Sequence, residues 1–425
     1  SGHDFFTIGH TSTSVSLACG LAKARDLKGG HENIIAVIGD GSLSGGEAYE
    51  GLSNAGEMGT NLIIVVNDNE MSIAENHGGL YQNLKELRDT EGRSSCNFFR
   101  SLGLDYLYVG EGNDIPSLVA AFAKVKDTSR PTVVHIHTQK GKGYAPAEAD
   151  REEFHWEMPF DLETGKPKVD CSGMEDYHSL TGKFLLEKMK EDHTVVAISS
   201  GTPTVIGFTP ERRKQAGRQF VDVGIAEEHA VALASGIAAG GGRPVYGVYS
   251  TFIQRCYDQL SQDLCINGNP AVITVFMGTV AGMNDVTHLG FFDIPLISNI
   301  PNMVYLAPTC SEEYFAMLEW AVRQTEYPVA IRVPGVAVVH RKEEFDTDYS
   351  ELNRYKMTAR GETVAILALG SFYDLGQALK NKLREESGVE ATLINPRYIT
   401  GLDEPMLEEL KVGHRIVVTL SLIHI

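Results

Sequence analysis

The sequence lacks several features that would place it in a specialised class of protein. It has no run of about 18 apolar residues, the length that a membrane-spanning helix needs. No signal peptide is visible, and we find no internal repeat and no low-complexity segment. The six cysteines form no CxxC pair, so we expect reduced, mostly buried thiols in a cytoplasmic protein.

Positive charge is also scarce. The 425 residues include 37 Lys and Arg against 56 Asp and Glu, a formal net charge of −19. A surface of this sign repels phosphate backbones and anionic lipids, so we expect neither a nucleic-acid nor a membrane partner. A small phosphorylated substrate stays possible, because it needs only a local basic pocket.

What the sequence does contain is an alternation of apolar strands and helices, which predicts the α/β fold class with three consecutive parallel-sheet domains. We place these domains at 1–165, 176–342 and 355–420, and interpret the charged, Pro- and Gly-rich residues 145–175 as a linker. The chain begins without methionine and ends on a strand, so we expect both ends, and with them the third domain, to be incomplete.

The most informative stretch is residues 37–72, where two apolar strands run into Gly39-Asp40-Gly41 and Asn67-Asp68-Asn69. Asp40 and Asn69 would each lie just past the carboxyl end of a strand, where open α/β sheets bind ligands. Two hard oxygen ligands suit Mg²⁺, and the glycines let the backbone approach a diphosphate closely. The pattern resembles the signature of thiamine diphosphate (ThDP) enzymes, a GDG turn followed by an asparagine after the next strand.

A second pattern is DVGIAEEH at 222–229, which leads into an apolar helix expected over 226–239. Burial would raise the pKa of Glu227, so this carboxyl could share a proton with N1′ of an aminopyrimidine ring. Phe252, in a helix expected over 252–266, would stack on that ring. Two plainer interpretations stay open: a carboxylate stabilised by the helix dipole, and an ordinary core aromatic.

Together these motifs are similar to those of the 1-deoxy-D-xylulose-5-phosphate synthase family in the transketolase superfamily. The resemblance runs from Gly9 to about residue 420, and its motifs are GHTSTS at 9–14, VIGDG at 37–41, NDNEMS at 67–72, KGKGY at 140–144, Phe154-His155, DVGIAEEH at 222–229, YSTFIQR at 249–255 and Thr287-His288. This family joins pyruvate, after decarboxylation, to glyceraldehyde 3-phosphate. It binds ThDP between its first and second domains and works as a homodimer, and the resemblance implies the same here.

The resemblance also implies roles for individual residues. The cofactor-binding residues would be His10, Ser12, Gly39, Gly41, Ser42, Lys140 and Phe252. The Mg²⁺ ligands would be Asp40, Asn69 and the carbonyl of Met71. The catalytic residues would be Glu227, His155 and His288, with the histidines moving protons to and from substrate oxygens. The substrate-binding residues would be Tyr249, Arg255, Asn284 and Asp285. A guanidinium fork suits phosphate oxygens, so Arg255 is the candidate for a substrate phosphate.

Three departures from the family pattern concern the acceptor. An arginine expected near the end of the strand at 271–278 is absent, and a family loop of the form GADGxTH here reads GMNDVTH. The family's Arg-Tyr-Pro-Arg-Gly is Arg332-Val333-Pro334-Gly335 in this chain, so the second arginine is missing. Each lost charged hydrogen bond is worth about 1.5–3 kcal/mol. We therefore keep two alternatives: a transketolase-like ThDP enzyme with a different donor or acceptor, and an inactive ThDP-binding subunit.

Overall fold

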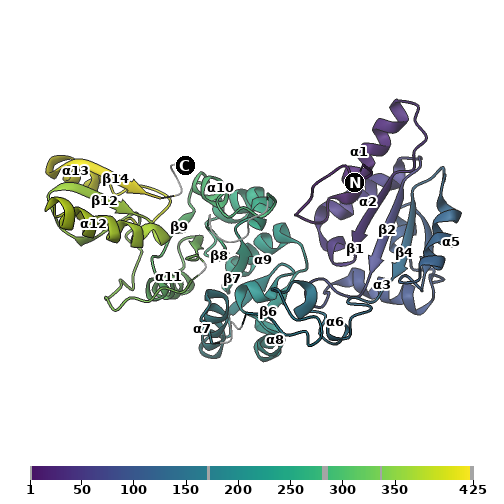
Figure 1. Ribbon diagram of the computed structural model, residues 1–425, viewed down its shortest axis with the longest axis horizontal. Helices are drawn as coiled ribbons and strands as arrows, with labels where there is room; N and C mark the ends of the chain where they lie inside the picture. The colour runs from purple at the N-terminus through teal and green to yellow at the C-terminus, as the bar shows by residue number, and fades with distance from the viewer. Residues whose placement is uncertain (1, 170–172, 280–285, 336, 422–425) are drawn as a thin grey trace. The chain divides into compact units, whose positions relative to one another are not determined.

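The chain, drawn as a ribbon in Figure 1, forms two units. Each unit has its own hydrophobic core. The first is Ser1–Met174 with two short later segments, Ser200–Thr202 and Asp222–Ala226, and the rest of the chain forms the second. The structure is a computed structural model that describes residues 2–169, 173–279, 286–335 and 337–421. Within those ranges, no helix has the length and apolar character that crossing a membrane requires.

The first unit contains a four-stranded sheet in the order β1-β2-β4-β3, and all of its neighbouring strands are parallel. Its strands are β1 (Ile35–Gly39), β2 (Ile63–Asp68), β3 (Asp105–Val109) and β4 (Thr132–His137). Alternate residues of β2 enter two different cores. Ile64 and Val66 pack with residues of α1 (Ser14–Leu27), α2 (Gly46–Glu57) and α3 (Gly79–Asp89), whereas Ile63 and Val65 pack with α5 (Ile115–Val125). Both faces are therefore covered, which explains the continuous apolar runs of the sequence.

The register of this sheet aligns the two motif turns. Gly39 lies opposite Asn67 at the paired ends of β1 and β2, and Asp68 lies opposite His137 of β4. Because parallel strands end at the same edge, the GDG turn and the NDN turn lie side by side there, as the sequence predicts.

The second unit contains a six-stranded sheet in the order β6-β5-β7-β8-β10-β9. The pairs from β5 to β9 are parallel. Its strands are β5 (Val195–Ser199), β6 (Phe220–Asp222), β7 (Arg243–Tyr249), β8 (Val272–Phe276), β9 (Val304–Leu306) and β10 (Val329–Arg332). The principal helices of this part of the chain are α7 (Tyr177–Glu191), α9 (Glu227–Ala239) and α11 (Ser311–Arg323).

Residues 252–265 are helical throughout, close to the helix expected over 252–266, but the winding is not that of an ordinary α-helix. The chain instead forms a 3-10 helix, η5 (Phe252–Cys256), and then a π-helix, η6 (Gln259–Cys265). The buried side chains are Ile253 and Cys256 in the 3-10 helix and Leu260, Leu264 and Cys265 in the π-helix.

The second unit also contains a four-stranded sheet in the order β11-β13-β12-β14. Three of its strands form the parallel run expected for the third domain, and β11 is an additional strand that sequence reasoning did not include. Its strands are β11 (Lys356–Ala359), β12 (Thr363–Ala368), β13 (Thr392–Asn395) and β14 (His414–Leu420), with helices α12 (Tyr373–Ser387) and α13 (Glu404–Gly413). β12 pairs in parallel with β13 and β14, but β11 pairs antiparallel with β13. Only residues 360–362 separate β11 from β12, too few for the helical crossover that parallel strands need.

The segment 145–175 is not the plain linker that its composition suggests. Its described part carries α6 (Ala145–Ala149) and the 3-10 turn η2 (Glu153–His155). The rings of Tyr144, Phe154 and Phe160 pack together with centroids 5.5–5.9 Å apart, so aromatic packing folds the segment. The remaining short elements are η1 (Gly41–Ser44), α4 (Phe98–Ser101), η3 (Pro203–Ile206), α8 (Pro210–Ala216), η4 (Gly217–Gln219), α10 (Asp293–Ser298) and η7 (Gly370–Phe372).

Candidate active site

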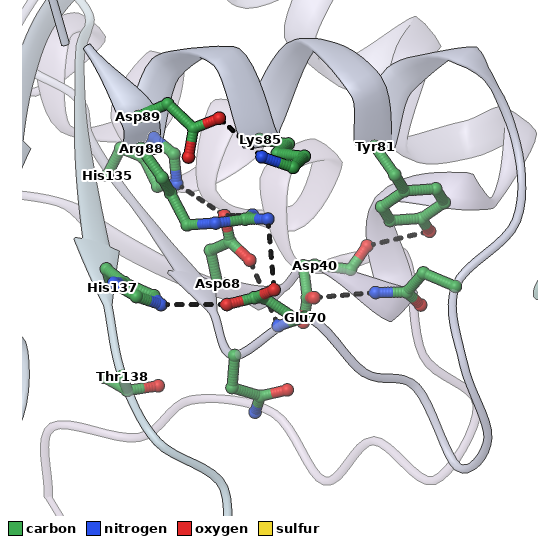
Figure 2. A network of polar contacts seen from close by, with 12 residues as sticks. Asp40, Asp68, Glu70, Tyr81, Lys85, Arg88, Asp89, His135, His137 and Thr138 are labelled. Carbon is green, nitrogen blue, oxygen red and sulfur yellow. Dashed lines mark hydrogen bonds and ion pairs between the residues drawn. The ribbon is translucent and has the colours of Figure 1, made fainter. Parts of the chain in front are cut away.

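Asp40 is the buried carboxyl group at the end of β1, with 1% of its surface exposed. Its N–H donates to the carbonyl of Asn67 at 3.0 Å, and its Oδ2 accepts a hydrogen bond from Asn76 Nδ2 at 2.7 Å. Tyr81 donates its hydroxyl to the Asp40 carbonyl at 3.1 Å (Figure 2). Burial, and then the negative charge of Asp68, raises the pKa of Asp40 to about 7. A bound cation would offset both effects.

The neighbouring turn holds Asn69, whose Oδ1 accepts the N–H of Met71 at 3.2 Å. No group of three or more His, Cys, Asp or Glu side chains in the described ranges is arranged to hold a metal ion. The ligands predicted at this edge are the carboxylate of Asp40, the amide of Asn69 and the carbonyl of Met71, which are hard oxygen donors. Such a set fits Mg²⁺, which keeps several positions for phosphate and water oxygens.

A glycine-rich cradle lies beside Asp40. The Oγ of Ser12 is buried and has no hydrogen-bond partner among the described residues, and Ser12 has a left-handed backbone with φ 82°. A Cβ on Gly45 would collide with that hydroxyl, and a Cβ on Gly41 would lie 2.8 Å from the Cβ of Ser72. The two glycines thus make room for the two serines, and the orphaned buried hydroxyl of Ser12 beside Gly45 fits an anion that accepts its hydrogen bond.

The other predicted residues of this cradle differ in how tightly they are held. Ser42 shares a short hydrogen bond with Thr11, and His10 is partly buried two residues before Ser12. At Gly39, in contrast, a Cβ would meet its nearest atom at 3.9 Å, so space alone does not require glycine there.

Lys140 lies close to this cradle within the first unit. Its Nζ donates to the carbonyl of Ser72 at 2.6 Å and lies 3.2 Å from Nδ1 of His155. Burial lowers the pKa of Lys140 although Asp40 opposes the shift. Desolvation and then the charge of Lys140 lower the pKa of His155, which favours the neutral imidazole that can accept a proton.

The segment that precedes Glu227 also belongs to the first unit and contacts the GDG turn. Ser44 Oγ donates to the carbonyl of Gly41 at 2.7 Å and accepts the N–H of Ile225 at 2.7 Å. A Cβ on Gly224 would lie 2.8 Å from Ser44, so only glycine fits this close approach. This serine therefore ties the GDG turn to the DVGIAEEH motif.

Glu227 is the first residue of α9 and is 2% exposed. Burial raises its pKa, and the guanidinium of Arg255 opposes that shift, with Nη1 3.4 Å from Oε2. The structure therefore places Arg255, predicted to bind a substrate phosphate, against this carboxyl group. A buried acid with a raised pKa is suited to sharing a proton with a ring nitrogen.

A small pocket lies at the carboxyl ends of β7 and β8 and is lined by Tyr249, Thr251, Met277, Thr279, His288 and Gly290. The ring of Phe252 meets those of Tyr249 and His288 edge to face, with centroids 5.7 and 5.6 Å apart. No lysine or arginine is among the described lining residues, and Met277 stands near the position of the missing family arginine. Asn284 and Asp285 lie outside the described residues.

Arg332 is the arginine that this chain shares with the family pattern. Its side chain is buried and makes hydrogen bonds within the protein. Its Nε donates to Asp293 Oδ2 at 2.8 Å and its Nη2 to the carbonyl of Gly290 at 2.8 Å. At Gly335, where the second family arginine would stand, a Cβ would have its nearest neighbour at 3.7 Å, in Thr279. Arg332 thus supports the loop behind the pocket.

Sequence reasoning did not assign roles to several of these residues. Ser72 and Asn76 follow the NDN turn, Tyr81 lies on α3, and Ser44 follows the GDG turn. Ser72 lies inside a family motif, which was a usable signal. The contacts of Asn76 and Tyr81 with Asp40, and of Ser44 with Ile225, join residues that are far apart in sequence, and no local pattern indicates them.

Comparison with known proteins identifies the family. A family model described as 1-deoxy-D-xylulose-5-phosphate synthase matches residues 1–95, and one described as the transketolase pyrimidine binding domain matches residues 175–338. A 1-deoxy-D-xylulose-5-phosphate synthase of Geobacter sulfurreducens is 37% identical over 448 residues, which cover 96% of this chain and 69% of that protein. The chain belongs to the 1-deoxy-D-xylulose-5-phosphate synthase family. A synthase of Clostridium beijerinckii is also 37% identical, over 97% of this chain and 71% of that protein.

Solved structures agree with this family at the level of the fold. A transketolase from Pichia stipitis aligns with 97% of this chain and 74% of its own, with a TM-score of 0.50 and 17% identity. As a member of the synthase family, the chain is a ThDP-dependent transferase that uses a divalent metal.

Proposed function

We propose that this chain catalyses the ThDP-dependent decarboxylation of pyruvate and joins the remaining two carbons to glyceraldehyde 3-phosphate. The products are CO₂ and 1-deoxy-D-xylulose 5-phosphate, a precursor of isoprenoids, thiamine and pyridoxal. The single observation that carries the proposal is the buried Glu227 at the start of α9, whose pKa is raised. A carboxyl group in that state is what activation of an aminopyrimidine requires.

The residues of the first unit would hold the charged end of the cofactor. Asp40, Asn69 and the carbonyl of Met71 would bind Mg²⁺, and the orphaned hydroxyl of Ser12 would donate to the diphosphate. Lys140 would add a positive charge there. When bound, ThDP supplies an electron sink that lets CO₂ leave pyruvate.

The chain's own groups would manage the protons. Glu227 would hold a proton at the pyrimidine nitrogen, and Phe252 would pack against the ring face. His155 and His288 would donate protons to, and accept them from, the substrate oxygens. In support, the pKa of His155 is lowered, so its imidazole is neutral near neutral pH, and His288 lines the pocket beside Phe252.

The acceptor site is where this chain differs from the family pattern. The described lining of the pocket contains no Lys, Arg, Asp or Glu, so the acceptor phosphate would rely on fewer guanidinium groups. The curated relatives are nevertheless named as 1-deoxy-D-xylulose-5-phosphate synthases, which favours glyceraldehyde 3-phosphate over another acceptor. We expect the difference to weaken acceptor binding rather than to change the reaction.

The test is to incubate the purified chain with ThDP, Mg²⁺ and carboxyl-labelled pyruvate, with and without glyceraldehyde 3-phosphate. We expect labelled CO₂ and a product with the mass of 1-deoxy-D-xylulose 5-phosphate. Glu227→Ala should lower CO₂ release by at least about a hundredfold, the usual contribution of a proton-transferring group. Glu228→Ala, one residue further along the same helix, is the matched control. Absence of CO₂ at saturating cofactor would refute the proposal.

We further propose a homodimer in the cytoplasm. The homodimer follows from the family resemblance, and the location follows from the scattered cysteines, of which Cys19, Cys96, Cys256, Cys265 and Cys310 are free thiols. Sedimentation equilibrium across a range of protein concentrations would test the dimer.

A further inference from the structure

One arginine holds the residues on both sides of the predicted metal ligand Asn69. Arg88, near the end of α3, places Nη1 2.5 Å from Asp68 Oδ2 and Nη2 3.3 Å from Glu70 Oε2 (Figure 2). Its side chain is 12% exposed, so the contact with Asp68 is shielded from solvent. We call Arg88, Asp68 and Glu70 the arginine clamp.

Asp68 is the buried end of this clamp, with its side chain fully inaccessible. Besides Arg88, its Oδ2 lies 2.9 Å from Nε2 of the buried His135, and its Oδ1 accepts the N–H of Glu70 at 3.2 Å. His135 is in turn fixed by the hydroxyl of Tyr106, 2.7 Å from Nδ1. The carboxylate is therefore paired on both oxygens, and it holds the first residue after Asn69 through that residue's backbone.

Glu70 is the outer end, and its backbone is in the left-handed region with φ 68°. This conformation costs energy for a residue other than glycine and persists only where the surroundings enforce it. Here the enforcing contacts are Arg88 and, on the other carboxylate oxygen, Nε2 of His137 at 3.2 Å (Figure 2). The turn therefore depends on these contacts of its neighbours as well as on the hydrogen bond from the Met71 N–H to Asn69 Oδ1.

We propose that Arg88 is a positioning residue for the divalent metal: by holding Asp68 and Glu70 together, it fixes the turn that presents Asn69 and the Met71 carbonyl. The inference rests on the proposed ThDP and Mg²⁺ site. Partners behind the direct ligands of a metal commonly change its affinity by 10–100-fold. A purely structural arginine would instead change the stability of the fold and leave metal affinity unaltered.

The experiment measures Mn²⁺ as a spectroscopic substitute for Mg²⁺. Wild-type protein with saturating ThDP is titrated with Mn²⁺, and free Mn²⁺ is followed by electron paramagnetic resonance. We expect Arg88→Met to weaken Mn²⁺ binding by at least about tenfold. Glu70→Gln removes one charged contact at a half-exposed site, and we expect it to weaken binding about threefold. Lys85→Met, one turn earlier on α3 in the exposed pair with Asp89, is the control and should change nothing.

The outcomes distinguish a failure of the arginine clamp from a failure of the proposed ThDP and Mg²⁺ site. Weaker Mn²⁺ binding in Arg88→Met and Glu70→Gln, with wild-type binding in Lys85→Met, supports the clamp. Unchanged binding in the folded Arg88→Met variant overturns it. If Arg88→Met does not fold, unchanged binding in Glu70→Gln overturns it instead. Wild-type protein that binds no Mn²⁺ in the presence of ThDP would overturn the proposed cofactor site together with the clamp.

Discussion

Replacing Asp40 by asparagine should stabilise the cofactor-free protein at neutral and alkaline pH while weakening its metal site. Asp40 is 1% exposed, and burial together with the charge of Asp68 raises its pKa from the ordinary 3.8 to about 7. Asparagine has nearly the same shape as the protonated side chain and carries no charge. The variant therefore removes the cost of burying an unpaired negative charge.

The size and sign of the effect follow from the linkage between protonation and folding. The pKa of Asp40 is higher in the folded state than in the unfolded state. Its contribution to the free energy of unfolding is therefore fully present below pH 3.8 and is lost as the pH rises to about 7. At 1.36 kcal/mol for each unit of pKa, the wild type loses roughly 4 kcal/mol across that range. Asp40→Asn has no such loss, which corresponds to a melting temperature roughly 10 °C above that of the wild type at pH 8.

The assay is thermal unfolding of both proteins between pH 4 and pH 8, without ThDP or divalent metal. The difference in melting temperature should be large at pH 8 and should shrink steadily as the pH falls. Adding Mg²⁺ and ThDP at pH 8 should stabilise the wild type much more than the variant. The ionised Asp40 carboxylate destabilises the cofactor-free protein, but it attracts Mg²⁺ when the metal is present. Asp105→Asn, at a solvent-exposed carboxylate, serves as the control. Parallel pH profiles for wild type and Asp40→Asn would refute the reasoning.

Three further substitutions test other parts of the site. Arg332→Met leaves Asp293 buried without its cation and should lower the free energy of unfolding by about 3–5 kcal/mol, measured by urea unfolding. Gly41→Ala forces a Cβ to within 2.8 Å of Ser72, which costs about 1–3 kcal/mol of overpacking and should appear as weaker ThDP binding in calorimetry. Glu227→Gln keeps the shape of the side chain but cannot share its proton, so ThDP should still bind while CO₂ release falls at least about a hundredfold.

The sheet edge that carries the candidate metal site was predictable from sequence. Continuous apolar runs indicate strands covered on both faces, and in a parallel sheet such strands end at one edge, so residues just after two runs must lie near each other. The register of Gly39 with Asn67 bears out that placement, whereas the roles of Asp40 and Asn69 as metal ligands stay predictions.

Other features depend on packing that local sequence does not encode. The 3-10 and π-helical winding of 252–265 is not indicated by the apolar pattern, because the buried Leu260 and Leu264 have the spacing of an ordinary α-helix. The link from Ser44 to Ile225 joins two motifs that are far apart in the chain. The antiparallel edge strand β11 depends on its pairing with β13, which lies well beyond it in the sequence. Each requires a tertiary contact before it can be seen.

The arginine clamp could be predicted from the sequence in part, because the position of Arg88 on its helix is unusual for a charged residue. Leu84 and Leu87 define the buried face of α3, and Arg88 follows Leu84 by four residues, which places it on the same face. Lys85, one position after Leu84, points to solvent and pairs with Asp89. A permanently charged group on the apolar face of a helix needs a buried anion, since an unpaired guanidinium is too costly to bury. Asp68 and Glu70, which flank Asn69, supply that anion. The ion pairs that make a charged Arg88 tolerable on this face therefore also hold the turn at Asn69.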